Sequence, residues 1–227
     1  MIKRLVSRID PKIWNRSGKV FYSGRDAYRK ANDLYLIGLN PGGSPAEHSQ
    51  ETVQSHTIDV LNKFSARWSA YCDESWPTGS PAGNPPGTYG MQPRVLHMLC
   101  RLCRDPRDTP SSNLIFVRSR REANLSRKEI RKLADLCWPF HQEVIRVLRP
   151  RVIVCFGKTT GKSIRDRLSA NHHAGQFIEN KERRWTSESH LSDEGIAVVT
   201  VTHPSIADWT KSVTDPTPLV QQMLERS

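Results

Sequence analysis

Short apolar runs that alternate with amphipathic stretches form the main pattern along this chain. The apolar runs are rich in Leu, Ile, Val and Phe and have the length of buried strands. They lie at 34–39, 113–118, 151–156 and 196–202. Stretches with helical spacing of apolar residues lie between them, at 57–71, 93–104, 126–148 and 159–168. Strands that alternate with helices predict an α/β fold with three layers, α/β/α, around a mainly parallel central sheet.

The helix predicted over 126–148 has the clearest start. Ser126 is placed to act as its N-cap, and Glu129 follows three residues later, which together form the pattern of a capping box. Residues 169–195, in contrast, are polar and show no regular pattern, so no element is predicted there.

The length of 227 residues suits one medium-sized domain of this class. We therefore predict a single domain, 1–227, with an N-terminal extension at 1–33 and an insertion at 44–88. The insertion ends in Ser75–Gly87, which is rich in proline and glycine and which we interpret as an ordered surface loop or a lid.

Two of the predicted strands stop at a polar residue that is followed by proline. The first strand leads through Gly38 and Leu39 to Asn40, and the last leads to His203. Open α/β sheets bind their ligands in the crevice outside the carboxyl ends of the strands. We therefore expect the Asn40 amide and the His203 imidazole to face one crevice and to form a functional site. The alternatives are that Asn40 only caps a turn and that His203 is structural.

The charge of the chain suggests an anionic partner. The sequence has 34 Lys and Arg residues against 23 Asp and Glu, which gives a net charge of +11 and a pI near 9.7. Basic surfaces bind nucleic acids or anionic membranes, although a basic protein can also be merely soluble. No run of about 18 apolar residues is present, and the N-terminus has no apolar run of signal-peptide length. We therefore expect a cytoplasmic protein that does not enter a membrane.

The cysteines do not suggest a secreted protein or a metal site. Five cysteines are an odd number, unlike a disulfide framework. Cys100 and Cys103 form the one close pair, and no second pair at zinc-finger spacing follows. We expect no metal, no cofactor and a monomeric chain.

A glycine-rich segment at 156–163 follows the third strand and opens a helix, as a phosphate-binding loop does. Such a loop needs four residues between its glycines, whereas Gly157 and Gly161 enclose three. No predicted strand ends in an aspartate that would hold magnesium. We therefore favour a weaker interpretation, in which Gly157 and Lys158 at the helix N-terminus hold one backbone phosphate.

Taken in order, these segments resemble the uracil-DNA glycosylase superfamily over about residues 34–45 and 89–208. The run Gly38-Leu-Asn-Pro-Gly42 is similar to the first active-site motif of the mismatch-specific and single-strand-selective branches. The run His203-Pro-Ser205 is similar to the late motif of the superfamily.

The thermophile-type branch of that superfamily supplies two further similarities. Cys137–Gly157 resembles its helix–strand unit, and Asn113, which opens the predicted second strand, resembles its base-reading asparagine. That branch holds an iron–sulfur cluster on four cysteines, of which only Cys137 has a match here. A cluster is therefore not expected.

The resemblance implies a monofunctional DNA glycosylase that hydrolyses the N-glycosidic bond of uracil, or of a related deaminated or modified base, flipped out of DNA. Asn40 would orient the attacking water, and His203 would donate a hydrogen bond to O2 of the departing base. Asn113 would read the base, because a carboxamide can accept from uracil N3–H and donate to O4; alternatively, it only bonds backbone. The base-binding residues would be Gly38, Leu39, Tyr89 and Asn113. Tyr89 would stack on the base, with Trp76 as a rival and local packing as the alternative.

The residues expected to contact DNA surround these motifs. They are Gly42, Gly43, Gly157, Lys158, Ser205, Ile206, Arg118 and Arg120. A basic run flanks the Asn113 strand and is the expected backbone-binding face, although charge runs are often only solvated; it comprises Arg118, Arg120, Arg121, Arg127, Lys128, Arg131 and Lys132. Ile206 and Trp209 are candidates for a wedge that fills the gap left by the flipped base. No lysine stands in a motif position as a Schiff-base nucleophile, so strand cleavage is not expected.

Two other functions stay open on the sequence. One is a glycosylase for a bulky hypermodified base in foreign-DNA defence, for which the insertion at 44–88 would enlarge the pocket. The other is a catalytically weak nucleic-acid-binding member of the fold. The sequence does not define the base or the choice between single- and double-stranded DNA.

Overall fold

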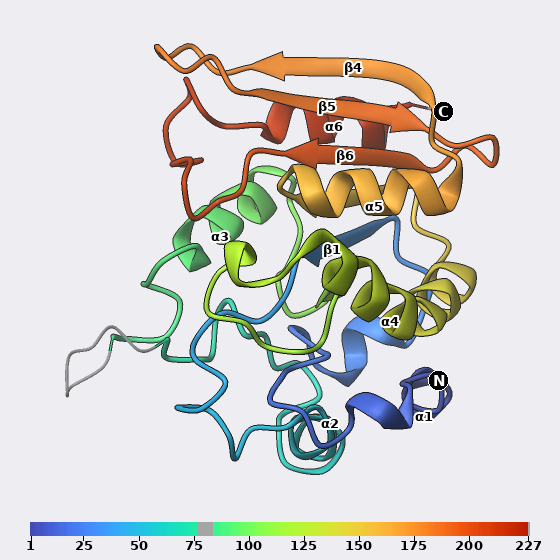
Figure 1. The fold of residues 1–227 in the computed structure, drawn as a ribbon. Coiled ribbons are helices and arrows are strands. Elements are labelled where there is room, and N and C mark those ends of the chain that lie inside the picture. The colour runs from blue at the N-terminus through green and yellow to red at the C-terminus, as the bar shows by residue number, and fades with distance from the viewer. Residues whose placement is uncertain (77–83, 227) are drawn as a thin grey trace.

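The computed structural model describes residues 1–76 and 84–226 and is built around a six-stranded sheet (Figure 1). The strands are β1 (Leu34–Gly38), β2 (Ser111–Asn113), β3 (Val152–Phe156), β4 (His172–Ile178), β5 (Thr186–Leu191) and β6 (Ala197–Val201). Their order in the sheet is β2-β1-β3-β6-β5-β4. Neighbours among β2, β1, β3 and β6 are parallel, whereas β5 is antiparallel to both β6 and β4. The chain is thus an α/β protein with a mixed, mostly parallel sheet.

Six α-helices flank the sheet in the described part of the chain. They are α1 (Ile2–Val6), α2 (Val53–Asn62), α3 (Gln92–Arg101), α4 (Arg127–Leu148), α5 (Lys158–Leu168) and α6 (Thr217–Glu225). The capping box predicted at the start of α4 is confirmed, because Ser126 Oγ accepts from Glu129 N and the Glu129 carboxylate accepts from Ser126 N. None of the described helices is long and apolar enough to cross a lipid bilayer.

Each face of the sheet packs against its own helices. Successive strand residues point to opposite faces, so Ile37 and Cys155 join one apolar cluster while Leu36 and Val154 join the other. The first cluster contains buried residues of α4, and the second contains buried residues of α3 and α6. Because both faces are covered, the parallel strands are apolar throughout. This explains why they could be recognised as continuous apolar runs in the sequence.

The segments before β1 and after it are built into the core. Leu5 and Phe21, from residues 1–33, belong to the same buried cluster as the sheet residues. Val53 and Trp68, from the predicted insertion, belong to it as well. The part of the insertion that the structure describes is therefore packed into the protein. Most of its Pro/Gly-rich stretch, residues 77–83, lies outside the described residues.

Two sequence predictions of secondary structure were wrong in their bounds. The helix expected at 57–71 is α2, which begins earlier because Thr52 and Ser55 form a capping box, and which ends at Asn62. The strand expected at 113–118 is β2, which ends at Asn113. Asn113 therefore closes this strand, whereas the sequence placed it at the start.

The sequence analysis missed two strands, β4 and β5, and two α-helices, α1 and α6. Residues 169–195 contain the hairpin of β4 and β5, whose mixed burial and register shift between His173 and Gly175 hide the alternation expected of a strand. The C-terminal helix α6 was not predicted either. It begins just after Pro216, and the side chain of Asp215 accepts from Thr217 N at 2.9 Å, so its start signal was present in the sequence.

Candidate functional site

The polar residues singled out by the sequence follow neighbouring strands at one edge of the sheet. Asn113 ends β2 and pairs in register with Gly38, the last residue of β1, and Asn40 follows two residues later. Gly157 follows β3, and His203 follows β6, its ring 6.4 Å from that of Phe156 between centroids. The carboxyl ends of these parallel strands therefore bring two amides and one imidazole to a common edge.

The Asn40 carboxamide is held by one end only. Its Nδ2 donates to the backbone oxygen of Pro41 and to Ser119 Oγ, both at 2.9 Å. The carbonyl of Pro41 can only accept, so the nitrogen must face it and Oδ1 must point the other way. No donor to Oδ1 is found among residues 1–76 and 84–226. Asn40 is thus a fixed acceptor, the group needed to orient a water molecule.

His203 is held in one tautomer by the residue two positions after it. Its Nδ1 lies 3.1 Å from Ser205 N and 2.7 Å from Ser205 Oγ. A backbone N–H can only donate, so Nδ1 must be the unprotonated nitrogen and the proton of the neutral ring must sit on Nε2. Burial lowers the pKa of His203 below its usual value, and the nearby Glu122 carboxylate opposes that shift. At neutral pH, His203 is therefore a neutral ring with an N–H donor on Nε2.

Helix α3 fixes the loop that carries His203. Arg94, near its start, donates to the backbone oxygen of Pro204 and lies 3.8 Å from Asp208. At the last residue of α3, Arg101 binds Asp215, which lies further along the segment that follows His203. The sequence did not indicate these contacts, since they join residues more than 100 positions apart.

Asn113 is the most buried of the three side chains. It is 6% exposed, and its Nδ2 has no hydrogen-bond partner among the described residues. A Cβ atom on Gly38 would lie 2.2 Å from Asn113 Oδ1, so only glycine at that position leaves room for the carboxamide. A buried amide without a partner costs about 1–3 kcal/mol, which makes it a candidate for binding a ligand.

Tyr22 is a site residue that the sequence analysis missed. Its backbone N–H donates to Ser111 O at 2.9 Å, which brings the N-terminal segment beside β2. Its hydroxyl lies beside the Asn113 carboxamide without completing a hydrogen bond to Nδ2. Burial raises the pKa of Tyr22 above its usual value, so the hydroxyl stays protonated. The only signal in the sequence was the pair Phe21-Tyr22 in a segment otherwise taken as an extension.

The aromatic residues expected to stack on a base lie further out. Trp76 packs on Tyr71, which in turn packs on Tyr22, with ring centroids 6.1 and 6.0 Å apart. Tyr89 is 40% exposed and begins the turn that leads into α3. The row of aromatic rings from Tyr22 to Trp76 therefore begins beside Asn113. Tyr89 precedes Gly90, where an added Cβ atom would lie 3.8 Å from the Trp76 ring.

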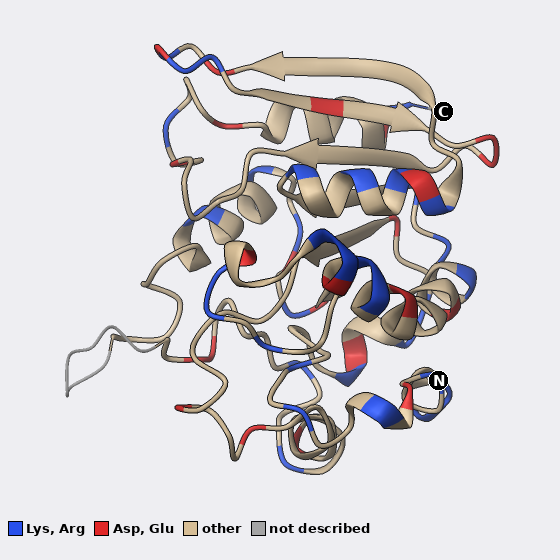
Figure 2. Ribbon diagram, in the orientation of Figure 1, with Lys and Arg blue, Asp and Glu red and all other residues tan. Residues whose placement is uncertain are grey.

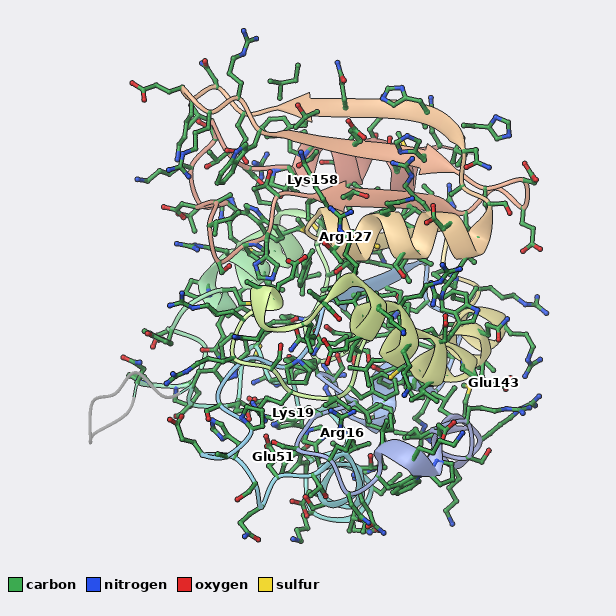
Figure 3. The ribbon with its side chains drawn as sticks, viewed as in Figure 1. Arg16, Lys19, Glu51, Arg127, Glu143 and Lys158 are labelled. Atoms are coloured by element: carbon green, nitrogen blue, oxygen red, sulfur yellow. The ribbon has the colours of Figure 1, made fainter. Side chains whose placement is uncertain are left out.

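Arg118 has a structural role that differs from the expected contact with DNA. Its side chain is 6% exposed, and it donates to the backbone oxygen of Gly42 and to Glu51. Lys19 lies 3.3 Å from Glu51 and also binds Glu74 (Figure 3). These charges are paired with one another. The hydrogen bond from Arg118 to the Gly42 carbonyl fixes the loop that contains Gly42. The sequence prediction failed because a run of basic residues does not show which of them turns inward.

Other basic residues of the same run do face solvent. Arg120 and Arg121 line a concavity of about 570 Å³ together with Asn124. Arg120 has only a 3.7 Å contact with Glu47, and both side chains are well exposed. The ribbon coloured by charge shows this basic loop beside the start of α4 (Figure 2). The remaining exposed members of the run are Arg127, Lys128, Arg131 and Lys132.

The start of α5 lies next to His203. Gly157 has φ +90°, and a Cβ atom there would lie 3.7 Å from the His203 side chain. Lys158 is exposed at the first position of the helix (Figure 3). Thr159 donates to Glu122, which explains how that carboxylate comes close to His203. Glu122 and Ser119 are further residues near the site that the sequence did not single out.

The two wedge candidates differ sharply. Ile206 is 62% exposed beside Ser205, so it can reach a partner. Trp209 is fully buried and donates through Nε1 to Thr202 O at 3.1 Å, so the prediction that it could act as a wedge was wrong. Ser205, Gly42 and Lys158 are exposed, as a contact with DNA would require.

The described residues offer no metal centre. No group of three or more His, Cys, Asp or Glu side chains is close enough to hold an ion in residues 1–76 and 84–226. Cys137 and Cys155 are buried, and burial raises the pKa of both thiols. Comparison with models of known protein families finds no match, and a search of curated proteins finds no significant relative.

Proposed function

We propose that this chain is a monofunctional DNA glycosylase that hydrolyses the N-glycosidic bond of uracil, or of a related deaminated base, flipped out of DNA. One observation carries the proposal. After β1 and β6, the strands on either side of β3, the protein fixes one polar atom of Asn40 and one of His203, and within residues 1–76 and 84–226 it leaves Asn40 Oδ1 and His203 Nε2 without partners. The fixed acceptor suits the attacking water of a hydrolysis, and the fixed donor suits the departing base.

The reaction follows from these two atoms. Asn40 Oδ1 accepts a hydrogen bond from a water molecule whose oxygen attacks the anomeric carbon of the sugar. The new C–O bond replaces the C–N bond, and the electron pair of the C–N bond leaves with the base. His203 Nε2–H donates to the base oxygen on which negative charge develops. The attacking water loses its proton to solvent, and the base anion takes one from solvent.

Asn113 is the residue that we propose reads the base. Its carboxamide is buried beside the Tyr22 hydroxyl and has an unpartnered Nδ2. Uracil offers an acceptor at O4 and a donor at N3, which a carboxamide can satisfy, whereas cytosine offers the opposite pattern. A wrong base would leave the buried amide unpaired, so discrimination by this residue is strong.

The basic edge supports DNA as the partner. Arg120, Arg121 and Lys158 are exposed around the site, and the chain carries a net charge of +11. Binding of this kind releases counterions, so affinity for non-target DNA should fall steeply with salt. A log–log slope shallower than about −1 would remove the basic edge from the proposal.

The decisive experiment measures base release from a panel of labelled DNAs under single-turnover conditions. The panel contains uracil, hypoxanthine, xanthine and modified cytosines, each in single-stranded and duplex form. We expect uracil or a related deaminated base to be released and the strand to stay uncut until alkali is added. Release of a bulky modified base alone would favour the hypermodified-base alternative. DNA binding without release of any base would leave only a binding module.

A further inference from the structure

The turn that joins β4 to β5 projects from the same edge of the sheet as the candidate site. Because β5 runs antiparallel to β6, it begins where β6 ends (Figure 1). A hydrogen bond of 3.2 Å from Thr202 N to Ser187 Oγ joins the two strands there. The turn, residues 179–185, therefore extends beyond the edge that carries His203. Two strand spacings, about 10 Å, separate β4 from β6.

Three basic side chains point into solvent from this turn. Lys181, Arg183 and Arg184 are exposed, and none of them has an ion-pair or hydrogen-bond partner for its side chain in residues 1–76 and 84–226. The charge-coloured ribbon shows the basic segment at this turn (Figure 2). Glu182 is the exposed acid of the turn, while Glu179 is only 3% exposed at its base. The solvent-facing charge of the turn is therefore positive.

The backbone of the turn adopts a conformation that arginine does not favour. Arg184 N donates to Lys181 O at 3.0 Å, and Arg184 itself has φ +42°. This left-handed region favours glycine and tolerates asparagine, because a Cβ atom crowds the backbone there. A strained residue on an exposed turn is a reason to look for function in its side chain.

One contact to a neighbouring loop and one contact within the turn hold it in place. Asn180 N donates to Val213 O at 3.0 Å, which ties the turn to the loop that follows His203. Arg183 lies over the ring of Trp185, with its guanidinium carbon 5.1 Å from the ring centroid. A cation over an indole face is partly ordered before any ligand arrives. The backbone of the turn and the guanidinium of Arg183 are therefore held in place.

We propose that the β4–β5 turn is a DNA-backbone contact that binds phosphates flanking the flipped nucleotide, opposite the basic loop at 120–124. This inference rests on the proposed function for the identity of the ligand. The basic loop follows Ser119, which bonds Asn40 after β1, and its Glu122 bonds Thr159 at the start of α5, after β3. The turn lies beyond β6 on the other side of His203. DNA bound across the edge would thus be held on both sides of the reacting sugar.

The test compares two arginines that share one backbone conformation. Arg149, at the end of α4, has φ +52° and is exposed, but it lies at the opposite edge of the sheet. Arg184→Gly and Arg149→Gly remove the same charge and relieve the same kind of strain. Affinity for a short fluorescein-labelled duplex with an abasic-site analogue is measured by anisotropy over a salt series, and thermal melting checks the fold.

We expect Arg184→Gly to weaken binding by about 5–10-fold at low salt and to reduce the log–log salt slope by about 1. Arg149→Gly should leave both quantities unchanged, and both variants should melt at or slightly above the parental temperature. Arg184→Lys should keep most of the affinity, since it retains the charge. If Arg184→Gly failed to fold, Arg184→Asn, which tolerates the left-handed region, takes its place.

The outcomes separate this inference from the proposed function. Equal losses in both variants, or no loss in either, would overturn the role of the turn while leaving base release intact. If duplex binding depends on Arg184 but the protein releases no base, the role of the turn in DNA binding would be supported and the proposed glycosylase activity would be overturned. A parent protein that binds neither this duplex nor the corresponding single strand would overturn both.

Discussion

Asn32 and Asn40 lie beyond the two ends of the same strand, β1, and the protein uses their carboxamides differently. Before the strand, Asn32 donates through Nδ2 to Asp108 O at 2.8 Å and accepts from Leu34 N at 3.2 Å. After the strand, the contacts of Asn40 within residues 1–76 and 84–226 hold it only through Nδ2. A carboxamide with both ends in use stabilises the fold, whereas one with a free acceptor is available to a ligand. The two edges of the sheet therefore differ in which polar atoms remain free.

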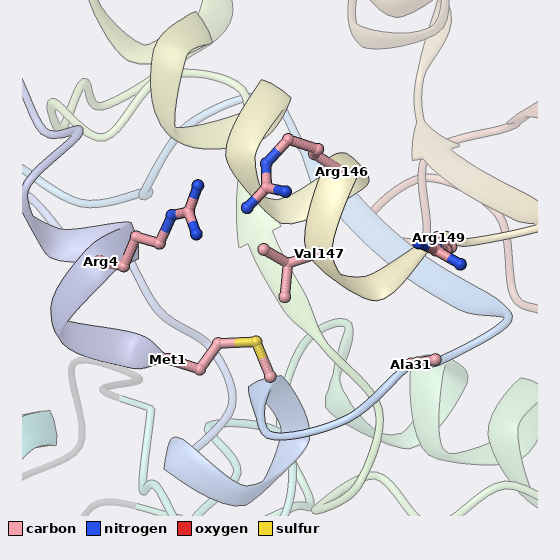
Figure 4. A pocket seen from close by; sticks show the side chains of 6 residues that line it. All are labelled: Met1, Arg4, Ala31, Arg146, Val147 and Arg149. Carbon is pink, nitrogen blue, oxygen red and sulfur yellow. The ribbon is translucent and has the colours of Figure 1, made fainter.

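Arginines at the two edges show the same difference. At the amino edge, a concavity of about 540 Å³ is lined by Met1, Arg4, Ala31, Arg146, Val147 and Arg149 (Figure 4). Arg4 and Arg146 both bind Glu143, and the hydrogen bond from Arg146 lowers the pKa of that carboxyl. At the carboxyl edge, Arg120 has only a loose contact with an exposed glutamate. Arginine content alone thus says little, and the pairing of each side chain decides its role.

The largest expected effect sets Asn40 and His203 against Asn32. We expect Asn40→Ala and His203→Ala each to slow base release by about two orders of magnitude or more, with DNA affinity within a few-fold, because both act on the transition state. Asn32→Ala should leave the rate unchanged but lower the free energy of unfolding by about 1–2 kcal/mol, because it removes two hydrogen bonds. Single-turnover kinetics and urea denaturation measure the two effects. A near-parental rate in Asn40→Ala or His203→Ala would remove that residue from the mechanism.

The second prediction sharpens the role of Asn113. Asn113→Asp should slow uracil release by about ten- to a hundredfold, because a carboxylate faces uracil O4 with a second acceptor. The same change offers acceptors to the amino group of cytosine, so a slight gain in cytosine release is expected. Single-turnover assays on both duplexes, with folding checked by circular dichroism, measure this. Uracil release at the parental rate in a folded protein would mean that another residue reads the base.

The third prediction compares two neighbouring arginines with opposite environments. Arg118→Ala should lower the free energy of unfolding by about 1–2 kcal/mol, since Glu51 would lose one partner but keep Lys19. Arg120→Ala should leave stability within about 0.5 kcal/mol and reduce the salt slope of DNA binding by about 1. Denaturant melts and anisotropy titrations compare the variants. Equal stability losses would contradict the distinction between a buried and an exposed arginine.

The smallest expected effect concerns pH. Burial holds the pKa of His203 below its usual value, so the rate should be constant through neutral pH and fall only under more acidic conditions. Protonation would place a proton on Nδ1, which then could no longer accept from Ser205. Glu122 raises this pKa, so Glu122→Gln should lower it and move the acid limb of the pH–rate profile to lower pH. A shift toward higher pH would show that Glu122 does not act on His203 in this way.

The sequence predicted three of the four parallel strands well, whereas it misplaced the bounds of β2 and missed the hairpin of β4 and β5. β1, β3 and β6 are buried on both faces, so each is a continuous apolar run that ends near a polar residue. The hairpin of β4 and β5 is half exposed, and β4 is the outer strand, so its sequence lacks that signal. The failure at Arg118 and Trp209 has a related cause, because burial of a single side chain depends on what packs against it.

His203 and Asn40 mark the boundary between what the sequence determined and what only the tertiary structure decided. The His203 tautomer is set by Ser205, two positions away, so the local motif contains all of the information. The Asn40 amide is oriented in part by Ser119, 79 positions away, and Tyr22 reaches Asn113 from a different segment altogether. Short-range hydrogen bonds form wherever the motif occurs, whereas contacts between distant segments exist only after the whole chain has packed.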